Sequence, residues 1–346
     1  MNPRLRFTLQ TVAFVGLTVA GAWWAYQRGG VVPEDLQHLK QLPPKYWAWI
    51  GMLSIGLYVS DAWRYVTTGR AIDVSVSWAT AVHASIACNF FSCLTPGAAF
   101  GAPASIVMLA RSGLSWEVST IIGFAKSTVG SAMLQACAFV FLLIGLGPVL
   151  PKGITGLLLW GSGLSAFGLG FTLVAGMYPK PVQAAARRLG AYMESHPNHA
   201  DTMIGRVVQR LMTGLVVAVE RLQAFRPMRL PEVLLSQVVY FGCFVGLAVV
   251  LGTALGATPT KEMWGVSTVY VAFLYVAPTP GGAGLAEGAA QDFFGALLAP
   301  AAAALTVILF RALTFYLYVL VGMLHVMWVG GVGSVLAEVE AAGTGE

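Results

Sequence analysis

Charged residues are scarce in this sequence of 346 residues. Only 10% of the residues are Asp, Glu, Lys or Arg, whereas 57% are hydrophobic, and the mean hydropathy is +0.74. A soluble domain carries about a quarter charged residues, so this chain could not cover a water-facing surface with charge. The composition therefore excludes a soluble globular protein and predicts an all-α polytopic membrane protein.

Cysteine is rare in the sequence, and a glycine-rich nucleotide-binding loop is absent from it. The chain has four cysteines, Cys88, Cys93, Cys137 and Cys243, and all lie in apolar runs without the spacing of a metal site or a disulfide framework. There is no Gly-x-x-x-x-Gly-Lys-Ser/Thr loop, and the five histidines are scattered. We therefore expect no cofactor, no metal and no catalytic constellation, and any transport would use a gradient or need no energy.

Long apolar runs are abundant, and they define the expected organisation. Six are long enough to span a bilayer, at about 9–27, 46–66, 118–148, 154–178, 230–256 and 299–330. Two more, 77–94 and 263–277, are shorter. We expect one integral membrane domain over 1–346, with a first half at about 46–178, a cytoplasmic amphipathic linker at about 179–229 and a second half at about 230–330.

Basic residues set the expected orientation. They concentrate in residues 179–229, and Arg4 and Arg6 precede the first apolar run. Because positive loops stay on the cytoplasmic side, we predict that the linker and both termini face the inside of the cytoplasmic (inner) membrane. An apolar face over residues 204–222 would lie in the inner headgroup layer or pack on the protein itself. The net charge of +5 indicates anionic lipid rather than nucleic acid as a partner.

The triplet Thr-Pro-Gly occurs twice, at residues 95–97 and 279–281, and ends each of the two shorter apolar runs. Lys126 lies thirty residues after the first proline, and Arg311 lies thirty-one after the second. With the predicted orientation, the first broken segment enters from the inside and the second from the outside. The pattern predicts two re-entrant helical hairpins related by an inverted repeat.

Such an arrangement is typical of a transporter binding site. Irregular backbone at membrane depth must be buried in protein or line a wet cavity, and matching Gly/Pro breaks in inverted halves indicate where the substrate binds. Buried cations in the following spans favour an anionic head group, and Glu287 would pair with Arg311 or carry a proton. The alternative for Lys126, Arg311 and Glu287 is a purely structural ion pair. We interpret Asp61 and Arg64 as an interfacial ion pair at the inner end of their span. We expect Asn89 to form a hydrogen bond between helices.

The broken segments resemble a known family, the flippase-like membrane domain of lysyl-phosphatidylglycerol synthases and its stand-alone relatives. The second half matches that family's Pro-Gly-Gly-x-Gly-x-x-Glu run, followed by an Arg and a Tyr in the next span. The first half matches its Thr-Pro-Gly start, but Ala102 and Ala125 stand where the family has or often has Glu. The resemblance therefore implies that the first half lacks its acidic partner. Together, residues and resemblance give a candidate substrate site: Thr95, Pro96, Gly97, Gly101, Lys126, Thr279, Pro280, Gly281, Gly282, Gly284, Glu287, Arg311 and Tyr316.

Three functions are compatible with these features. The leading hypothesis, implied by the resemblance, is a flippase or translocase that moves an anionic or phosphate-bearing lipid between leaflets. The second is an integral membrane enzyme acting on a lipid phosphate, and the third is a non-transporting partner of a separate lipid- or glycan-modifying enzyme. The chain ends at Glu346 without the soluble aminoacyl-transfer domain of the bifunctional relatives, so that activity is not expected of it.

Overall fold

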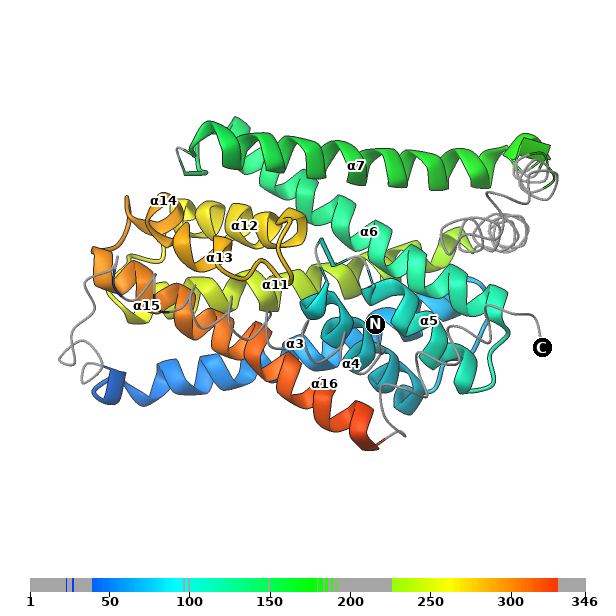
Figure 1. Ribbon diagram of the computed structural model, residues 1–346, viewed down its shortest axis with the longest axis horizontal. Coiled ribbons are helices and arrows are strands. Elements are labelled where there is room, and N and C mark those ends of the chain that lie inside the picture. Colours follow the sequence, from blue (N-terminus) through cyan, green and yellow to red (C-terminus); the bar gives the residue numbers. More distant parts are fainter. Residues whose placement is uncertain are drawn as a thin grey trace, which may run out of the picture.

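The computed structural model describes residues 39–178 and 226–328, apart from Pro96, Ala99 and Val149, with isolated residues elsewhere. The secondary structure of these residues is helical (Figure 1). The predicted span at about 9–27 and the amphipathic face at 204–222 lie outside the described residues.

Within the described residues, four helical stretches are long and apolar enough to cross a membrane. They are Trp116–Leu143, Lys152–Gly170, Pro227–Ala254 and Pro300–Val326, which confirms an all-helical protein with transmembrane helices. They correspond to α6 (Trp116–Leu143), α7 (Lys152–Met177), η1 with α11 (Pro227–Arg229 and Leu230–Ala254), and α15 with its continuation. α3 (Pro44–Ala71) is as long as α6 but more polar, because it carries an aspartate and two arginines within its length.

The last of these stretches is not a regular α-helix throughout. α15 (Pro300–Arg311) passes directly into a π-helical turn, η2 (Ala312–Tyr316), and then into α16 (Leu317–Trp328). π-Turns inside helices are rare and recur at functional sites. Here the turn begins at the residue that follows the buried Arg311.

Both segments predicted to be broken are indeed interrupted. The first consists of α4 (Trp78–Leu94) and α5 (Gly101–Arg111), which pack on each other. The second consists of α12 (Lys261–Val276) followed by two short helices, α13 (Leu285–Gly288) and α14 (Ala290–Phe294). None of these helices reaches the roughly 20 residues that a bilayer requires.

The two breaks meet each other inside the bundle. The amide of Gly97, in the first break, donates a hydrogen bond to the carbonyl of Ala277, in the second, over 3.2 Å. In Figure 1, α4 and α5 occupy one end of the elongated molecule, and α12 to α14 occupy the other. The two non-helical stretches therefore face one another near the middle of the long axis.

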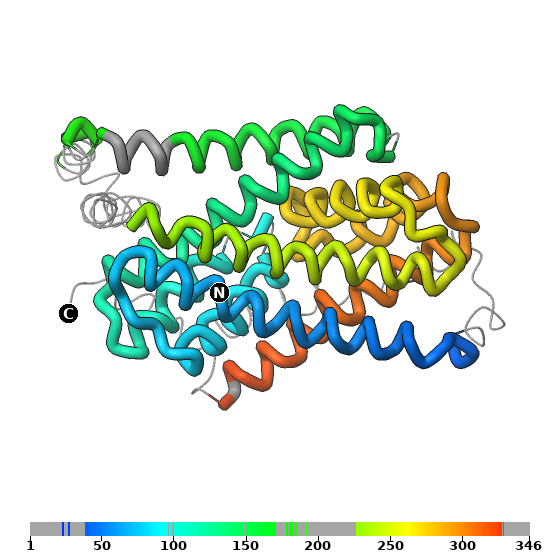
Figure 2. Tube along the Cα trace, turned by 180° about the vertical axis from the view of Figure 1, so that it is seen from behind, coloured from blue at the N-terminus to red at the C-terminus, as the bar shows by residue number. Residues whose placement is uncertain are grey.

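The core is formed around α11, whereas α7 lies apart. Most of the apolar window of α11 is buried, against 11% for that of α7, and α11 packs along α3. Figure 2 shows α7 as an outlying helix, and its contacts are with α6 and α12. Its side chains Trp160, Leu164 and Phe167 are exposed, as expected for a helix at the lipid-facing edge of the bundle.

Candidate functional site

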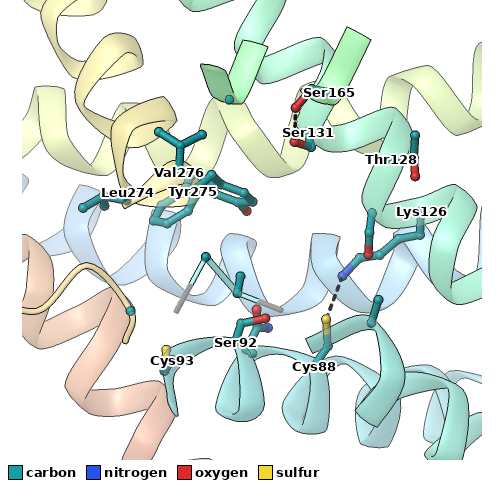
Figure 3. A pocket seen from close by; sticks show the side chains of 18 of the residues that line it. Cys88, Ser92, Cys93, Lys126, Thr128, Ser131, Ser165, Leu274, Tyr275 and Val276 are labelled. Carbon is teal, nitrogen blue, oxygen red and sulfur yellow. Dashed lines mark hydrogen bonds between the residues drawn. The ribbon is translucent and has the colours of Figure 1, made fainter. Parts of the chain in front are cut away.

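A cavity of about 850 Å³ lies where the two breaks meet. Residues from both breaks line it, together with side chains of α3, α4, α6, α7, α11 and the π-turn (Figure 3). A pocket of this size is in the range of small-molecule sites, which extend to about 1,000 Å³. Irregular backbone at membrane depth is expected to border such a space.

The charged groups on the cavity wall all carry the same sign. Arg64, Lys126 and Arg311 line it, and none of the described lining residues is a carboxylate. Two carboxylates, Asp61 and Glu287, are fully buried behind these cations. The cavity therefore presents positive groups to an occupant and keeps the compensating negative groups out of its reach.

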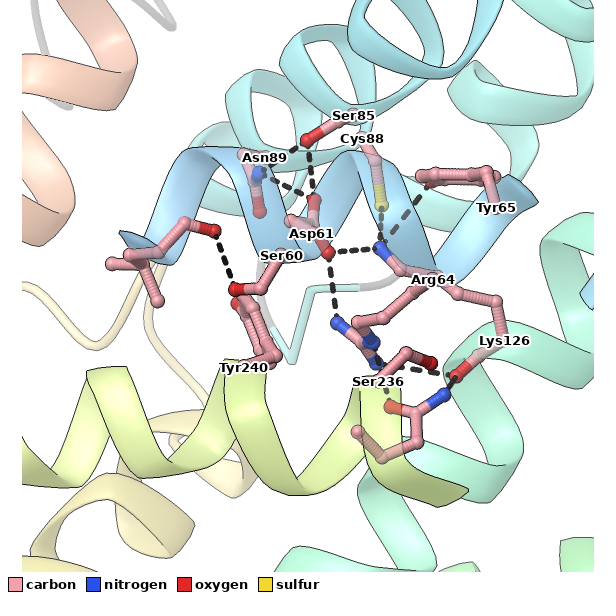
Figure 4. A network of polar contacts seen from close by, with 12 residues as sticks. Ser60, Asp61, Arg64, Tyr65, Ser85, Cys88, Asn89, Lys126, Ser236 and Tyr240 are labelled. Atoms are coloured by element: carbon pink, nitrogen blue, oxygen red, sulfur yellow. Dashed lines mark hydrogen bonds and ion pairs between the residues drawn. The ribbon is translucent and has the colours of Figure 1, made fainter. Parts of the chain in front are cut away.

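Asp61 is the centre of the first charged cluster (Figure 4). Its Oδ1 atom lies 2.8 Å from the Lys126 ammonium and 2.8 Å from a guanidinium nitrogen of Arg64. Its Oδ2 atom accepts hydrogen bonds from Ser85 and Asn89. Each oxygen of this buried carboxylate is thus fully satisfied, which is the condition for keeping a charge in the interior.

The two cations of this cluster are also held by neutral groups. The Arg64 Nε donates to the Gln237 side chain over 2.6 Å, and the guanidinium lies over the Tyr240 ring at 4.2 Å. The Lys126 ammonium lies 4.5 Å from the centre of the Tyr65 ring. Gly130 leaves room for the guanidinium, because a Cβ there would lie 2.2 Å from Arg64. Aromatic faces stabilise desolvated cations, so both positive charges are tolerated at depth.

Two interpretations of the first half are corrected here. Asp61 and Arg64 are not an interfacial pair: their exposed fractions are 0% and 3%, because α3 continues to Ala71 and places Asp61 about ten residues, roughly 15 Å, from the helix end. The first half also does not lack an acidic partner. Asp61 of α3 supplies to Lys126 the carboxylate that the alanines at 102 and 125 cannot.

The second cluster joins the π-turn to the second break. The Arg311 Nε donates to Glu287 over 2.9 Å, and its NH1 donates to the Gly281 carbonyl over 2.7 Å. The guanidinium stacks on Phe315 at 3.7 Å. Its remaining nitrogen, NH2, is buried and has no hydrogen-bond partner in the described part of the chain. Arg311 also lines the cavity, so this guanidinium borders the space while one of its nitrogens lacks an acceptor among the described residues.

Glycines shape the second break so that this cluster can form. Gly281 has φ +54° and a Cβ there would lie 2.1 Å from the Phe315 ring, so neither the conformation nor the space suits a larger residue. Gly284, with φ +80°, donates its amide to the Glu287 carboxylate over 2.8 Å. The short helix α13 therefore begins with a charge-assisted hydrogen bond that the Gly284 amide donates to the carboxylate of Glu287 in the same helix.

The predicted site residues divide into two groups. Gly97, Lys126, Gly281 and Arg311 line the cavity. The others do not line it but build the breaks and clusters around it: Thr95, Gly101, Thr279, Pro280, Gly282, Gly284, Glu287 and Tyr316. Pro96 lies outside the described residues.

Several residues of the site were not among the predicted ones. Asp61 and Arg64 form the first cluster together with Lys126, and Gln237 accepts a hydrogen bond from Arg64. Asn89 donates a hydrogen bond to the Asp61 carboxylate from another helix. The signal for Asp61 and Arg64 was their spacing of three residues in an apolar run, which places both on one helix face. Gln237 gave no signal beyond being a polar residue in an apolar span.

Comparison with known proteins agrees with this architecture. The chain matches the model of the lysylphosphatidylglycerol synthase TM region over residues 10–322. A comparison with curated proteins finds no match. Because the family match covers most of the 346 residues, the chain belongs to the family of the lysylphosphatidylglycerol synthase transmembrane region.

Proposed function

We propose that this protein is a lipid flippase or translocase that moves an anionic, phosphate-bearing lipid between the membrane leaflets. The observation that carries the proposal is the cavity wall, where three buried cations face the space and none of the described lining residues is a carboxylate. Membership of a family of membrane domains named for a lipid synthase supports a lipid-related role. A charge at the bilayer centre costs at least about 2.5 kcal/mol, so three of them around one cavity favour binding over packing.

We further propose that the two halves of the protein form an inverted repeat. We take α4–α5 and α12–α14 as re-entrant hairpins that enter from opposite membrane faces and meet at the Gly97–Ala277 hydrogen bond. Each hairpin is followed by a helix that supplies one cation, Lys126 from α6 and Arg311 from α15. An occupant held between them would be accessible from either side when one hairpin moves against the other, as in alternating access.

Acyl chains need not enter the cavity. Three residues that line it have exposed apolar side chains: Phe124 (39%), Trp160 (82%) and Leu164 (73%). This exposed apolar rim leads from the cavity to the lipid-facing surface of α7. The head group would occupy the positive interior while the acyl chains stay in the bilayer, which avoids drawing an apolar tail through a polar space.

Arg311 is the residue that we assign to phosphate. Its Nε and NH1 stay bound to Glu287 and Gly281, while NH2 donates to a phosphate oxygen. Pairing with an anion would give a hydrogen-bond acceptor to a nitrogen that is otherwise buried without a partner. A buried donor that makes no hydrogen bond costs free energy. Lys126 adds a second positive group from the opposite half.

Lipid transport by purified protein in liposomes tests this function. Protein reconstituted with a labelled anionic phospholipid should make inner-leaflet label accessible to a membrane-impermeant quencher, and Arg311→Gln should abolish this while the protein still folds. Release of inorganic phosphate from the lipid without translocation would favour the enzyme instead. If neither occurs unless a lipid- or glycan-modifying enzyme is added, the protein is a partner rather than a transporter.

Orientation is tested separately. We propose that both termini and residues 179–229 face the cytoplasm. Single-cysteine labelling in intact cells should modify a cysteine at Gln37 from outside but not one at His199. Labelling of the second position from outside would reverse the assignment of the two hairpins to the membrane faces.

A further inference from the structure

Hydroxyl side chains line the cavity beside Lys126. Ser127 and Thr128 follow Lys126 on α6. Ser131 lies about one turn further along, Ser165 faces it from α7, and Ser92 lies on α4; Figure 3 shows Thr128 and these three serines. The pitch of a helix, about 5.4 Å, separates Lys126 from Ser131 by little more than one turn. This wall of the cavity is therefore polar and uncharged, and it adjoins the positive group.

Three of these hydroxyls are not used by the protein itself. Serine and threonine in apolar helices usually donate to the carbonyl four residues before, and Ser119 and Thr120 of the same helix do so at 2.9 and 2.8 Å. Ser92, Ser127 and Thr128 have no hydrogen-bond partner within the residues that the structure describes, and all three face the cavity. Unused hydroxyls in a membrane interior are expensive unless something polar occupies the space beside them.

The other two hydroxyls form an exchangeable pair. Ser131 and Ser165 lie 2.9 Å apart and bond to each other across the α6–α7 contact. Either oxygen can donate or accept, so a ligand hydroxyl could replace the partner without leaving a charge unpaired. Such a wall suits a ligand group that is itself both donor and acceptor.

We propose that this wall, formed by Ser92, Ser127, Thr128, Ser131 and Ser165, is a second subsite that binds a neutral polyol. The substrate class is then a lipid phosphodiester whose phosphate carries a hydroxylated head group such as glycerol, inositol or a sugar. This inference rests on the proposed function, because it assumes that the cations hold the phosphate. A head group with its own positive charge is disfavoured, since three cations line the same space.

Lipid preference measured on the intact protein tests the subsite. Native mass spectrometry in detergent would compare phosphatidylglycerol, phosphatidic acid, which has the phosphate but no polyol, and phosphatidylethanolamine, which carries an amine. We expect phosphatidylglycerol to be preferred over phosphatidic acid by about tenfold, which corresponds to one or two net hydrogen bonds, and phosphatidylethanolamine to bind most weakly.

The decisive variant is Ser127→Ala/Thr128→Val/Ser131→Ala. It should bind phosphatidic acid as before and lose the preference for phosphatidylglycerol. It should still unfold cooperatively, at a temperature lowered only by the loss of the Ser131–Ser165 hydrogen bond. The matched control is Ser119→Ala/Thr120→Val, which removes two hydroxyls from the same helix that bond only to their own backbone, and it should keep the preference.

The results of these binding and transport measurements show whether the polyol subsite alone is wrong or the proposed function is wrong as well. If the triple variant keeps the phosphatidylglycerol preference, or if the wild-type protein binds both anionic lipids equally, the subsite is wrong although lipid transport stands. If no anionic lipid binds or crosses, the proposed function fails and the subsite fails with it.

Discussion

Replacing Asp61 with asparagine should destabilise the protein strongly, although the change is nearly isosteric. Asp61 is fully buried and pairs with both Arg64 and Lys126 at 2.8 Å. In the wild-type protein, two cations and one carboxylate leave one net positive charge in the cluster. Asp61→Asn leaves the two buried positive charges of Arg64 and Lys126 with no carboxylate among the groups that contact them.

The size of the effect follows from this geometry. Removing one partner of a buried ion pair costs about 3–5 kcal/mol. Asp61 holds two such partners and accepts two further hydrogen bonds, from Ser85 and Asn89, so we expect the upper part of that range. Domains of about 150–250 residues lose roughly 2–4 °C of unfolding temperature per kcal/mol. At that rate, about 4–5 kcal/mol should lower the unfolding temperature by roughly 8–20 °C, measured by differential scanning fluorimetry in detergent.

A double variant distinguishes charge balance from packing. Asp61→Asn/Lys126→Met restores one net positive charge, on Arg64, so it should regain much of the lost stability. Lys126→Met alone leaves the Arg64–Asp61 pair neutral and should unfold close to the wild-type temperature. Both variants lack the Lys126 charge and should transport poorly in liposomes.

Two results would refute the reasoning. If Asp61→Asn unfolds at the wild-type temperature, the cluster is not an ion-paired unit. If Lys126→Met destabilises as much as Asp61→Asn yet transports normally, Lys126 is structural and the cavity has lost one of its proposed binding groups.

Three further predictions concern the second half and α7. Arg311→Lys keeps the charge but loses the planar fork that reaches Glu287 and the Gly281 carbonyl, so transport in liposomes should be partial rather than absent. Gly281→Ala should cost about 2–5 kcal/mol, because it adds a left-handed backbone penalty to a clash with the adjacent ring, and thermal unfolding would measure it. Cysteines at Ser131 and Ser165, whose oxygens lie 2.9 Å apart, should cross-link and stop transport reversibly by fixing α7 against α6.

The last two of these predictions, Gly281→Ala and the cysteine pair at Ser131 and Ser165, each have a matched control. Gly97 has φ +58° but no atom within 4 Å of an added Cβ, so Gly97→Ala should cost only the backbone penalty of about 1–2 kcal/mol. Thr67 and Ser236 lie 3.0 Å apart and join α3 to α11 in the core, so cysteines there should cross-link without stopping transport. If Gly97→Ala lowers stability as much as Gly281→Ala, the clash with Phe315 is not the cause of the loss. If the Thr67–Ser236 cross-link also stops transport, fixing α7 against α6 is not the specific cause.

Much of this architecture could be predicted from residue types alone. Scarce charge and long apolar runs predicted the helical membrane class, and the repeated Thr-Pro-Gly located both breaks to within a few residues. Glu287 as the partner of Arg311 was also among the predicted alternatives, and the structure places them 2.9 Å apart. These features depend on local backbone chemistry, which a sequence shows directly.

The first charged cluster could not be predicted because it depends on tertiary contacts. Lys126 pairs with a carboxylate on α3, sixty-five residues earlier in the chain, and Arg64 donates a hydrogen bond to Gln237 on α11. No spacing rule connects such positions. The apolar run that ends near residue 66 also placed Asp61 too close to the end of its helix, because α3 remains helical through less apolar residues to Ala71.

The two clusters differ in a way that bears on how a head group would move. Arg311 and Glu287 are a neutral pair that needs only an acceptor for NH2, whereas the cluster of Asp61, Arg64 and Lys126 keeps one net positive charge. An anion in the shared cavity therefore meets one site that attracts it chiefly by hydrogen bonding and another that attracts it by charge. Charge attraction acts over a longer distance in a medium of low dielectric constant, so the Lys126 side would capture the head group, and the Arg311 side would orient the phosphate once it has entered.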